Sequence, residues 1–542
     1  MVQRALRLLL VSAALGCVSA ADKELEAQLT QLEQELQRNQ AEIKALEATH
    51  TRRLSSSIFS TGSGGYSPTD NLQGALTHAW LIICGALVMF MQAGFALLEA
   101  GVCRKKFVQN ILLKNLTDVA IGTLGWWIFG WSFAYSGPTV DEGGTSFKEN
   151  NFVGGQQFFA HHFSISRPDG QVEPSTDMVN WFFQWAFASA AATIVSGGVA
   201  ERVKFPGYCI YSFLLTSWVY PCQVAWTWGY GFLSSTLSTG YMDFAGSGVV
   251  HLVGGIGALT GAIIAGPRVN RFKAARFKFE PVLEEGEVDE YAPHSQPLVV
   301  LGTLILWFGW YGFNCGSTLA MGDIETGFKA AHVAMTTTIA ASFGGLTVFC
   351  LRYVLIKKYD VGAFCNGILA GLVSITAPCS NIDTGSAIIV GIMGGLFFQG
   401  ASSAMKLLKI DDPLDAFAVH GMCGMWGVIA AALFDWGHAF STVHGWNGFK
   451  CIMDSTTGLC MTGIGGELLA VNIAEIACIS LWTATWSTAI FLPLKFMGWL
   501  VASPEEQEIG FDEAKHSPSK AYDYSMGGGQ PSTDQPRDDT II

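Results

Sequence analysis

The sequence predicts an all-α membrane protein: eleven transmembrane helices, arranged as an inverted repeat of five and five helices plus a final helix, and preceded by an extracellular coiled coil. Three observations carry this prediction. Half of the 542 residues are apolar and only 14% are charged, whereas a soluble protein has about 25% charged residues. The chain contains many long apolar stretches. Finally, two histidines inside such stretches recur with the same neighbours in both halves of the chain.

The charge balance excludes nucleic acid as a partner. The chain has 31 Lys and Arg against 44 Asp and Glu, so its net charge is −13 at pH 7. Binding to a phosphate backbone needs a surplus of clustered positive charge. With a mean hydropathy of +0.34, the expected environment of the chain is the lipid bilayer.

The residues before the apolar stretches divide into three parts. In residues 1–20, two arginines precede a short apolar run that ends in small residues, which is typical of a secretory signal peptide. In residues 21–54, apolar residues recur at alternating steps of four and three, with Asn39 at one of these positions. This pattern predicts a coiled coil whose register is fixed by Asn39, and a solvated single helix is the alternative. Residues 55–73 are expected to form a linker.

The domain at 74–500 contains eleven apolar stretches of about the 20 residues that a helix needs to cross the hydrocarbon core. They are residues 79–99, 111–135, 179–199, 207–233, 244–266, 297–319, 330–350, 361–378, 385–404, 414–434 and 468–494.

The basic residues fall mainly on alternate connections between these stretches. Arg104, Lys105 and Lys106 follow the first stretch, and further groups of Lys and Arg follow the third, fifth, seventh and ninth. Because basic loops stay in the cytoplasm, we expect the N-terminus outside the cell and the tail, residues 501–542, in the cytoplasm.

The 13 cysteines do not predict a metal site. They form no CxxC pair and no Cys/His zinc pattern, and most lie inside apolar stretches as small hydrophobic residues. Cys451 and Cys460, nine residues apart in a polar stretch, are the candidate disulfide. We expect no metal and no cofactor.

Two histidines mark corresponding positions of the two halves. His251 and His420 each follow an aspartate, Asp243 or Asp412, by eight residues, and each precedes a glycine by four. They belong to the fifth and tenth stretches, and because five is odd, the second repeat enters the membrane from the opposite side. Eight residues of helix span roughly 12 Å, so both imidazoles are expected near the bilayer centre.

Several interpretations of this histidine pair are open. A structural hydrogen bond between helices is the simplest. A bis-imidazole haem site is another, although the glycine-flanked helices predict a narrow pocket. Because ionisable residues at this depth are costly and usually functional, we favour a pathway for a small neutral molecule that forms hydrogen bonds.

Aromatic residues gather at the predicted outer ends of neighbouring helices. Trp228 ends the fourth stretch, and Ser317 ends the sixth. Aromatic faces and a hydroxyl can hold a small cation, with about 0.5–2 kcal/mol for each cation–π contact. The alternative is an ordinary belt of aromatic residues at the membrane interface.

These residues and motifs resemble the ammonium transporter (Amt/Mep/Rh) family, over residues 74 to 522. The sequence DFAGSGVVHLVGG at 243–255 is similar to the family signature, and DAFAVHGMCGMWG at 415–427 to its partner in the second half. The resemblance implies that His251 and His420 are the twin pore histidines.

The resemblance also implies roles for the aromatic residues. Phe187 and Phe313 correspond to the stacked pair that closes the outer mouth. The expected ammonium-recruitment residues are Trp228, Ser317, Trp310 and Gln184, and the first two make the chain similar to the Amt branch rather than the Rh branch. Asp243 is expected to cap its helix, with a secondary electrostatic role.

Three features depart from the family pattern. The segment between Trp228 and Asp243 is longer by a few residues than in bacterial members. The segment 508–522 is similar to the regulatory tail of plant members, but Ala514 stands where those carry a phosphorylated threonine, so control by that modification is not implied. The predicted coiled coil lies outside the common core.

The resemblance implies a homotrimer in the plasma membrane that moves ammonium inward, with one pore per subunit. Ammonium would lose a proton at the phenylalanine pair, because a bare cation in hydrocarbon is far costlier than neutral NH3. Whether a separate proton follows is left open. An ammonium sensor that signals through its tail or coiled coil is the alternative, and an enzyme, such as a haem protein, is not expected.

Overall fold

The computed structural model describes residues 68–136, 139–140, 146–147, 152–161, 163, 165–166, 172–173, 175–237, 240–272, 290–435 and 466–522. In these residues the protein is an all-helical membrane protein, and its β-structure is limited to two antiparallel pairs of two-residue strands, β1 (Thr139–Val140) with β2 (Ser146–Phe147) and β3 (Ile165–Ser166) with β4 (Val172–Glu173). The chain divides into the units Met1–Ala75 and Leu76–Ile542. All packing described below is within the second unit.

Several predictions concern segments outside the described residues. These are the signal peptide at 1–20, the coiled coil at 21–54, the candidate disulfide between Cys451 and Cys460, and the tail beyond residue 522.

The helices follow the apolar stretches of the sequence. Their bounds are α2 Pro68–Val102, α3 Val108–Gly125, α4 Trp131–Tyr135, α5 Asp177–Gly198, α6 Phe205–Leu214, α7 Tyr220–Trp226, α8 Val253–Ala265, α9 Gln296–Gly316, α10 Ile324–Ile356, α11 Val361–Thr376, α12 Thr384–Leu407, α13 Cys423–Leu433, α14 Glu467–Phe496, α15 Pro504–Ile509 and α16 Phe511–Lys515.

Among the described residues, seven helices are long and apolar enough to cross a membrane: α2, α5, α8 with the turn before it, α9, α10, α12 and α14. Two further apolar helices, Val361–Thr376 and Phe417–Leu433, are shorter. The predicted stretches 111–135 and 207–233 are largely helical, but π-helical turns at Trp126–Gly130 and Leu215–Val219 interrupt them. The count of eleven spans therefore stays a prediction.

Helix α2 begins at Pro68, six residues before the boundary expected at residue 74. A proline suits the first turn of a helix, because the N–H that it lacks would have no partner there. Leu72, Leu76 and Trp80 then follow at steps of four, which continues one helical face through the predicted linker.

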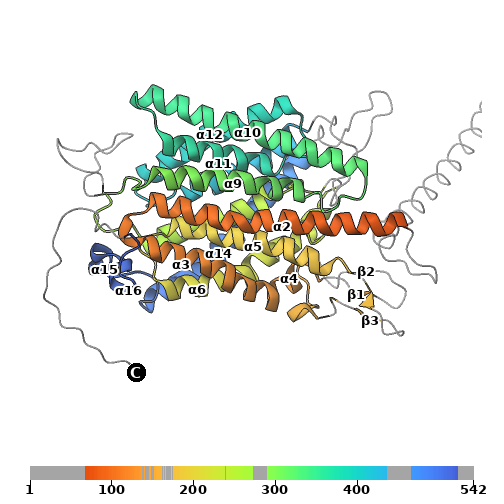
Figure 1. Ribbon diagram of the computed structural model, residues 1–542, viewed down its shortest axis with the longest axis horizontal. Helices are drawn as coiled ribbons and strands as arrows, with labels where there is room; N and C mark the ends of the chain where they lie inside the picture. The colour runs from red at the N-terminus through yellow and green to blue at the C-terminus, as the bar shows by residue number, and fades with distance from the viewer. Residues whose placement is uncertain are drawn as a thin grey trace, which may run out of the picture. The chain divides into compact units, whose positions relative to one another are not determined.

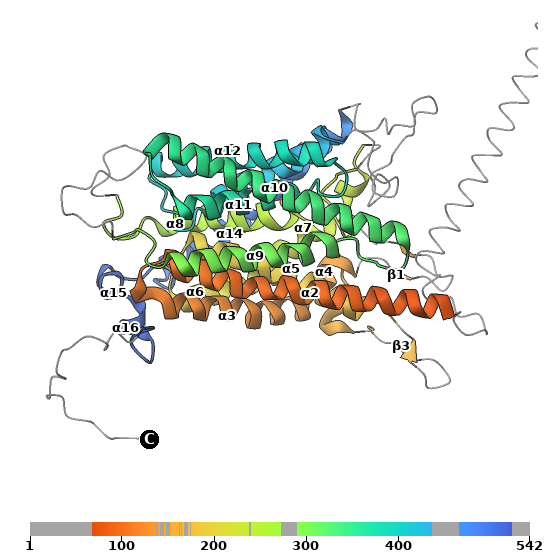
Figure 2. The same cartoon turned by 45° about the horizontal axis from the view of Figure 1, so that its top comes forward.

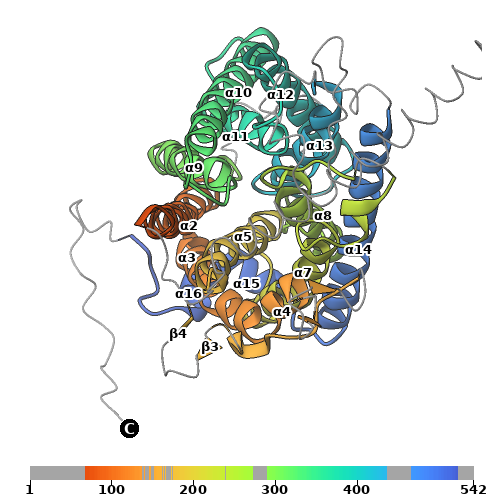
Figure 3. The same cartoon turned by 90° about the vertical axis from the view of Figure 1, so that its right-hand side faces the viewer.

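The helices run side by side, and their two ends differ (Figures 1 and 2). We call the end that carries α15 and α16 the tail side, and the opposite end, where α4 and α7 end, the cavity side. In the end-on view, α2 to α8 form one group and α9 to α13 the other, and α14 runs beside α8 where the two groups meet (Figure 3).

Glycines bring the two histidine-bearing segments together where these groups meet. A Cβ atom on Gly255 of α8 would lie 2.2 Å from the backbone nitrogen of Gly421. No side chain fits into that space, so the two backbones are in direct contact. A Cβ on Gly198 at the end of α5 would likewise lie 2.7 Å from the Cβ of Ala258 in α8.

The C-terminal segment packs against the tail side. Ser503 and Glu506 form a reciprocal capping box at the start of α15. Asp512 accepts hydrogen bonds from the backbone N–H groups of Gln109 and Asn110 in the first turn of α3, at 3.0 and 3.1 Å. Phe511 packs edge to face on Phe107, at 5.5 Å between ring centres. The segment is therefore tied to the beginning of α3.

Candidate functional site

His251 lies in a π-helical turn, Ser247–Leu252, that leads into α8. Asp243 holds the beginning of this turn. Its two carboxylate oxygens accept hydrogen bonds of 2.8–3.0 Å from four backbone N–H groups, those of Gly246, Ser247, Gly248 and Val249. These donors are the ones that the start of a helix leaves unpaired. The chain can turn there because Gly246 adopts a φ of +109°.

His420 lies in a similar π-helical turn, Phe417–Met422, ahead of α13. Asp412 accepts hydrogen bonds from the N–H groups of Ala416 and Phe417 at 3.0 and 2.8 Å. Burial, followed by the nearby carboxylate of Asp415, raises the pKa of Asp412 to about 6. Each histidine-bearing turn thus begins at its own aspartate, and the two aspartates lie at opposite sides of the bundle.

The two imidazoles meet in the interior. Their Nδ1 atoms are 3.1 Å apart, and both side chains are buried. The pair forms a hydrogen bond in which one nitrogen donates and the other accepts. Phe95 of α2 lies beside His420, with 6.2 Å between ring centres.

Aromatic rings continue from His251 toward the cavity side. The ring of Phe313 is stacked 5.3 Å from His251, and the ring of Phe187 is stacked 4.0 Å from Phe313. Trp228 meets Phe187 edge to face at 6.0 Å. The rings therefore form a continuous row from Trp228 to His420, carried by the turn after α7, by α5 and α9, and by the two π-helical turns.

A cavity of about 180 Å³ opens at the Trp228 end of this row. It is lined by Trp131, Tyr135, Asn180, Gln184, Trp228, Tyr230, Phe244, Ser317 and Leu319. Three of the four predicted recruitment residues are thus brought together. The fourth, Trp310, is not among the lining residues. It is stacked 5.0 Å from His251, and its Nε1 donates to Thr376 Oγ1 at 2.8 Å.

The cavity offers aromatic faces and hydrogen-bond acceptors. Trp228 is fixed because its Nε1 donates to the carbonyl of Asp243 at 2.9 Å. The hydroxyl of Ser317 donates to the carbonyl of Phe313 at 2.9 Å, which leaves its oxygen free to accept. Gln184 Oε1 is buried without a hydrogen-bond partner. Because the lining residues carry no formal charge, this arrangement suits a small cation with several N–H groups.

The sequence of the chain is similar to known transporters along most of its length. The sequence profile of the Ammonium Transporter Family matches residues 79–522. The chain belongs to the ammonium transporter family. It is 37% identical to "Ammonium transporter 1 member 3" of Solanum lycopersicum over 83% of this chain and 94% of the relative. It is 35% identical to "Ammonium transporter Amt2" of Archaeoglobus fulgidus over 84% and 90% of the two chains.

Solved structures of ammonium transporters share its fold. The chain of a "Sensor Amt Protein" matches with a TM-score of 0.68 and 30% identity, over 82% of this chain and 99% of that one. Mep2 of Saccharomyces cerevisiae matches with a TM-score of 0.67 and 26% identity, over 82% and 92% of the two chains. The likeness thus covers the whole region that carries the cavity and the histidines.

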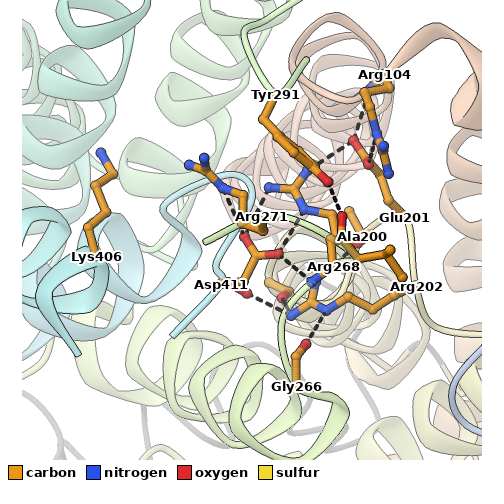
Figure 4. A network of polar contacts seen from close by, with 12 residues as sticks. Arg104, Ala200, Glu201, Arg202, Gly266, Arg268, Arg271, Tyr291, Lys406 and Asp411 are labelled. Atoms are coloured by element: carbon orange, nitrogen blue, oxygen red, sulfur yellow. Dashed lines mark hydrogen bonds and ion pairs between the residues drawn. The ribbon is translucent and has the colours of Figure 1, made fainter. Parts of the chain in front are cut away.

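On the tail side, this ammonium transporter family member has a network of buried ion pairs (Figure 4). Arg268 binds Asp411 at 2.8 Å and Glu201 at 3.0 Å, and Arg104 binds Glu201 at 2.6 Å. Burial opposes ionisation of Glu201, but Arg268 and Arg104 outweigh it and hold its pKa below the ordinary value. Tyr291 lies against both guanidinium groups, with its ring centre 4.7 Å from Arg104 and 4.8 Å from Arg268.

The same network joins the two halves of the chain. Arg202 is fully buried, and its guanidinium donates to four backbone carbonyls, those of Gly198, Ala200, Gly266 and Asp411, at 2.6–3.0 Å. Because Asp411 immediately precedes Asp412, the network also fixes the start of the segment that carries His420. This side of the bundle is therefore held by charge, and the cavity side by aromatic packing.

Sequence reasoning missed several residues of the site. Trp131 and Tyr135 line the cavity from α4, and Tyr230 lines it from the turn after α7. Another is Glu475 of α14, which is fully buried beside Asp243 and whose carboxyl oxygens have no hydrogen-bond donor. A lone acidic residue inside the last apolar stretch was the available signal for Glu475.

Proposed function

We propose that this protein transports ammonium along the row of rings, from the cavity to the tail side. Ammonium binds in the cavity at Trp228, Ser317 and Gln184, loses a proton near Phe187 and Phe313, and continues as NH3 past the two histidines. The observation that carries this proposal is the continuous row itself, in which an acceptor-rich cavity leads to a buried phenylalanine pair and then to two hydrogen-bonded imidazoles.

The chemistry of the cavity supports binding of the charged form. Ammonium has four N–H donors, and both Ser317 Oγ and Gln184 Oε1 have lone pairs to accept them. The indole face of Trp228 adds a cation–π contact of about 0.5–2 kcal/mol. Potassium has the same charge but no N–H groups, so it cannot form directed hydrogen bonds with these acceptors.

The phenylalanine pair supports loss of the proton. Its rings are 4.0 Å apart and fully buried, so no molecule fits between them and at least one ring must rotate to let a substrate through. Moving an unpaired ammonium ion into such surroundings costs far more than moving neutral ammonia. Passage as NH3 therefore requires less free energy than passage as NH4+.

The histidines then provide hydrogen bonds without charge. Two buried imidazoles that share a hydrogen bond can each be neutral, with one nitrogen as donor and the other as acceptor. Ammonia both donates and accepts, so it can exchange partners as it moves. His251 and His420 would thus carry the hydrogen-bonding part of the path in otherwise apolar surroundings.

The basic connections of the sequence support an orientation. The tail side, with Arg104, Arg202 and Arg268, corresponds to the cytoplasm, and the cavity side to the outside. The protein would lie in the plasma membrane as a homotrimer with one pore in each subunit, and move ammonium inward.

Ammonium-evoked currents and nitrogen uptake, measured with the purified protein in liposomes, test this function. We expect both to saturate with ammonium and to be absent when potassium replaces it. A protein that acts only as a sensor would show neither, and it would not rescue growth of yeast without ammonium transporters on low ammonium.

A further inference from the structure

A second group of ionisable side chains is buried beside the proposed pore and has no part in the row of rings. It consists of Glu99 of α2 with Lys114 and Asp118 of α3, all at most 1% exposed. Lys114 and Asp118 are four residues apart and share one face of their helix. We call these three residues the buried triad.

Hydroxyl groups hold the two carboxylates of the triad. Ser196 of α5 donates to Glu99 Oε2 at 2.9 Å. Asp118 accepts from the hydroxyl of Tyr208 at 2.7 Å and from that of Ser212 at 2.8 Å, both on α6. The positions of both acids are therefore fixed by neighbouring helices, as a permanent site requires.

The charges of the triad do not balance by themselves. Two carboxyl groups face one positively charged side chain, that of Lys114, whose charge acts on both acids. The other titratable groups that act on the triad are Cys103, Tyr208 and Arg202, and Arg202 is already bound to four carbonyls and faces Asp411. In a low-dielectric interior an uncompensated charge is very costly. One carboxyl therefore holds a proton, and two sites are available for it.

The triad and the helices that hold it carry several polar atoms without hydrogen-bond partners. They are Glu99 Oε1, Lys114 Nζ, Asn115 Oδ1, Gln92 Nε2 and Ser189 Oγ, all buried. Leaving so many buried polar groups without partners would be costly, most of all for the charged amino group of Lys114. Water molecules that bind several such groups at once remove this cost, and a chain of them conducts protons.

The triad lies between the level of the histidines and the tail side. Phe95, which contacts His420, is one helical turn from Glu99 on the same face of α2. In the other direction, Cys103 is one turn beyond Glu99, and its N–H donates to the Glu99 carbonyl. The ion pair of Arg104 with Glu201 follows directly after it.

We propose that Glu99, Lys114 and Asp118 form a proton-binding site that carries the proton released from ammonium to the tail side, separately from the path of NH3. The proton is shared by the two carboxyls and is passed on by water bound at the unpartnered polar atoms. The inference rests on the proposed function, because it needs a proton released inside the protein.

Glu99→Gln is the decisive variant. It keeps the shape and the acceptor for Ser196, and it leaves one lysine and one aspartate, which balance without an exchangeable proton. We expect the charge moved per nitrogen to fall by about tenfold or more, since a positioned acid or base typically speeds proton transfer by larger factors. Asp118→Asn should act in the same direction. The measurement compares the current with nitrogen uptake in liposomes that contain the purified protein.

Tyr211→Phe is the matched control, because it removes one buried hydroxyl of α6 that pairs with Ser487, away from the triad. It should leave the charge-to-nitrogen ratio unchanged. Infrared spectra give an independent readout: the carboxylic-acid band of the protonated triad should be present in the wild type and absent in both triad variants, whether or not they transport.

The outcomes separate the two proposals. A wild-type protein that moves no nitrogen would overturn the transport function. A wild type that moves nitrogen but no charge, or triad variants with the wild-type ratio and the acid band unchanged, would overturn only the proton site.

Discussion

Trp228 and Trp310 are expected to contribute to different steps of transport, although the sequence groups both with ammonium recruitment. Trp228 lines the cavity, whereas Trp310 is fully buried against His251. Replacing Trp228 with leucine removes the indole face from the cavity. It should therefore weaken binding, while a change at Trp310 should act on passage.

The contacts of Trp228 set the size of the effect. The lost cation–π contact amounts to about 0.5–2 kcal/mol. The hydrogen bond from its Nε1 to the carbonyl of Asp243 holds the ring in place and adds about 1 kcal/mol through positioning. Since about 1.4 kcal/mol corresponds to a tenfold change in affinity, the half-saturating ammonium concentration of Trp228→Leu should rise by roughly tenfold. Trp228→Phe retains a ring but loses the N–H, so its half-saturating ammonium concentration should lie between those of the wild type and Trp228→Leu.

The assay is the ammonium-evoked current over a range of concentrations, for protein at equal density in the membrane. Trp310→Phe is the matched comparison, because it removes an indole N–H bound to Thr376 and leaves the cavity lining intact. We expect it to lower the maximal current and to leave the half-saturating concentration near the wild-type value. If Trp228→Leu and the wild type had the same half-saturating ammonium concentration, the assignment of the binding site to this cavity would be refuted.

Three further changes test other parts of the site. Replacing His251 or His420 with Asp puts a charge into the imidazole pair. The variant should carry no ammonium current, or it should also conduct K⁺, and currents are measured with each cation in turn. Wild-type ammonium currents in both variants would mean that the pair has a structural role only. Asp411→Asn removes one of the two acidic partners of buried Arg268 and leaves Glu201. The loss of stability should therefore stay below the roughly 3–5 kcal/mol of a buried charge left wholly unpaired, and a lower unfolding temperature of the purified protein should show it. The pKa of Asp412 is raised to about 6, so its contribution to stability should fall as the pH rises from about 4 to 6, by about 3 kcal/mol at most. Asp412→Asn should make the stability less dependent on pH in this range. An unchanged slope would contradict the raised pKa.

The sequence contained enough information for the histidine pair but not for the cavity. The matched spacing of Asp243 and Asp412 to their histidines follows from helical geometry, and the structure shows both aspartates at the starts of the histidine-bearing turns. The cavity instead depends on the ends of three helices and a turn that meet only after folding. Tyr230, for example, reaches it from a turn in which its φ is +62°. No periodic pattern encodes such a position.

The separate positions of the residues on α9 could have been inferred from its geometry. Trp310 and Ser317 are seven residues apart, and at 1.5 Å per residue they are about 10.5 Å apart along the axis. They share a helix face but not a depth, so they cannot both line one small cavity. Phe313 lies between them, and the stacked pair that it forms with Phe187 divides the cavity from the histidines.

The two sides of the bundle differ in a way that suits directional passage of a proton-bearing substrate. On the cavity side, Asp243 accepts hydrogen bonds from four N–H groups, and the cavity lining holds no formal charge, so a cation can enter without competition from a resident lysine or arginine. On the tail side, Asp412 has two such donors, and the arginines next to it are already paired. In the proposed mechanism, the proton that ammonium loses at the phenylalanine pair needs a carrier beside the path of NH3. Of the ionisable residues that the structure describes, the buried triad has both the unpaired charge to bind that proton and contact with the helix that flanks His420.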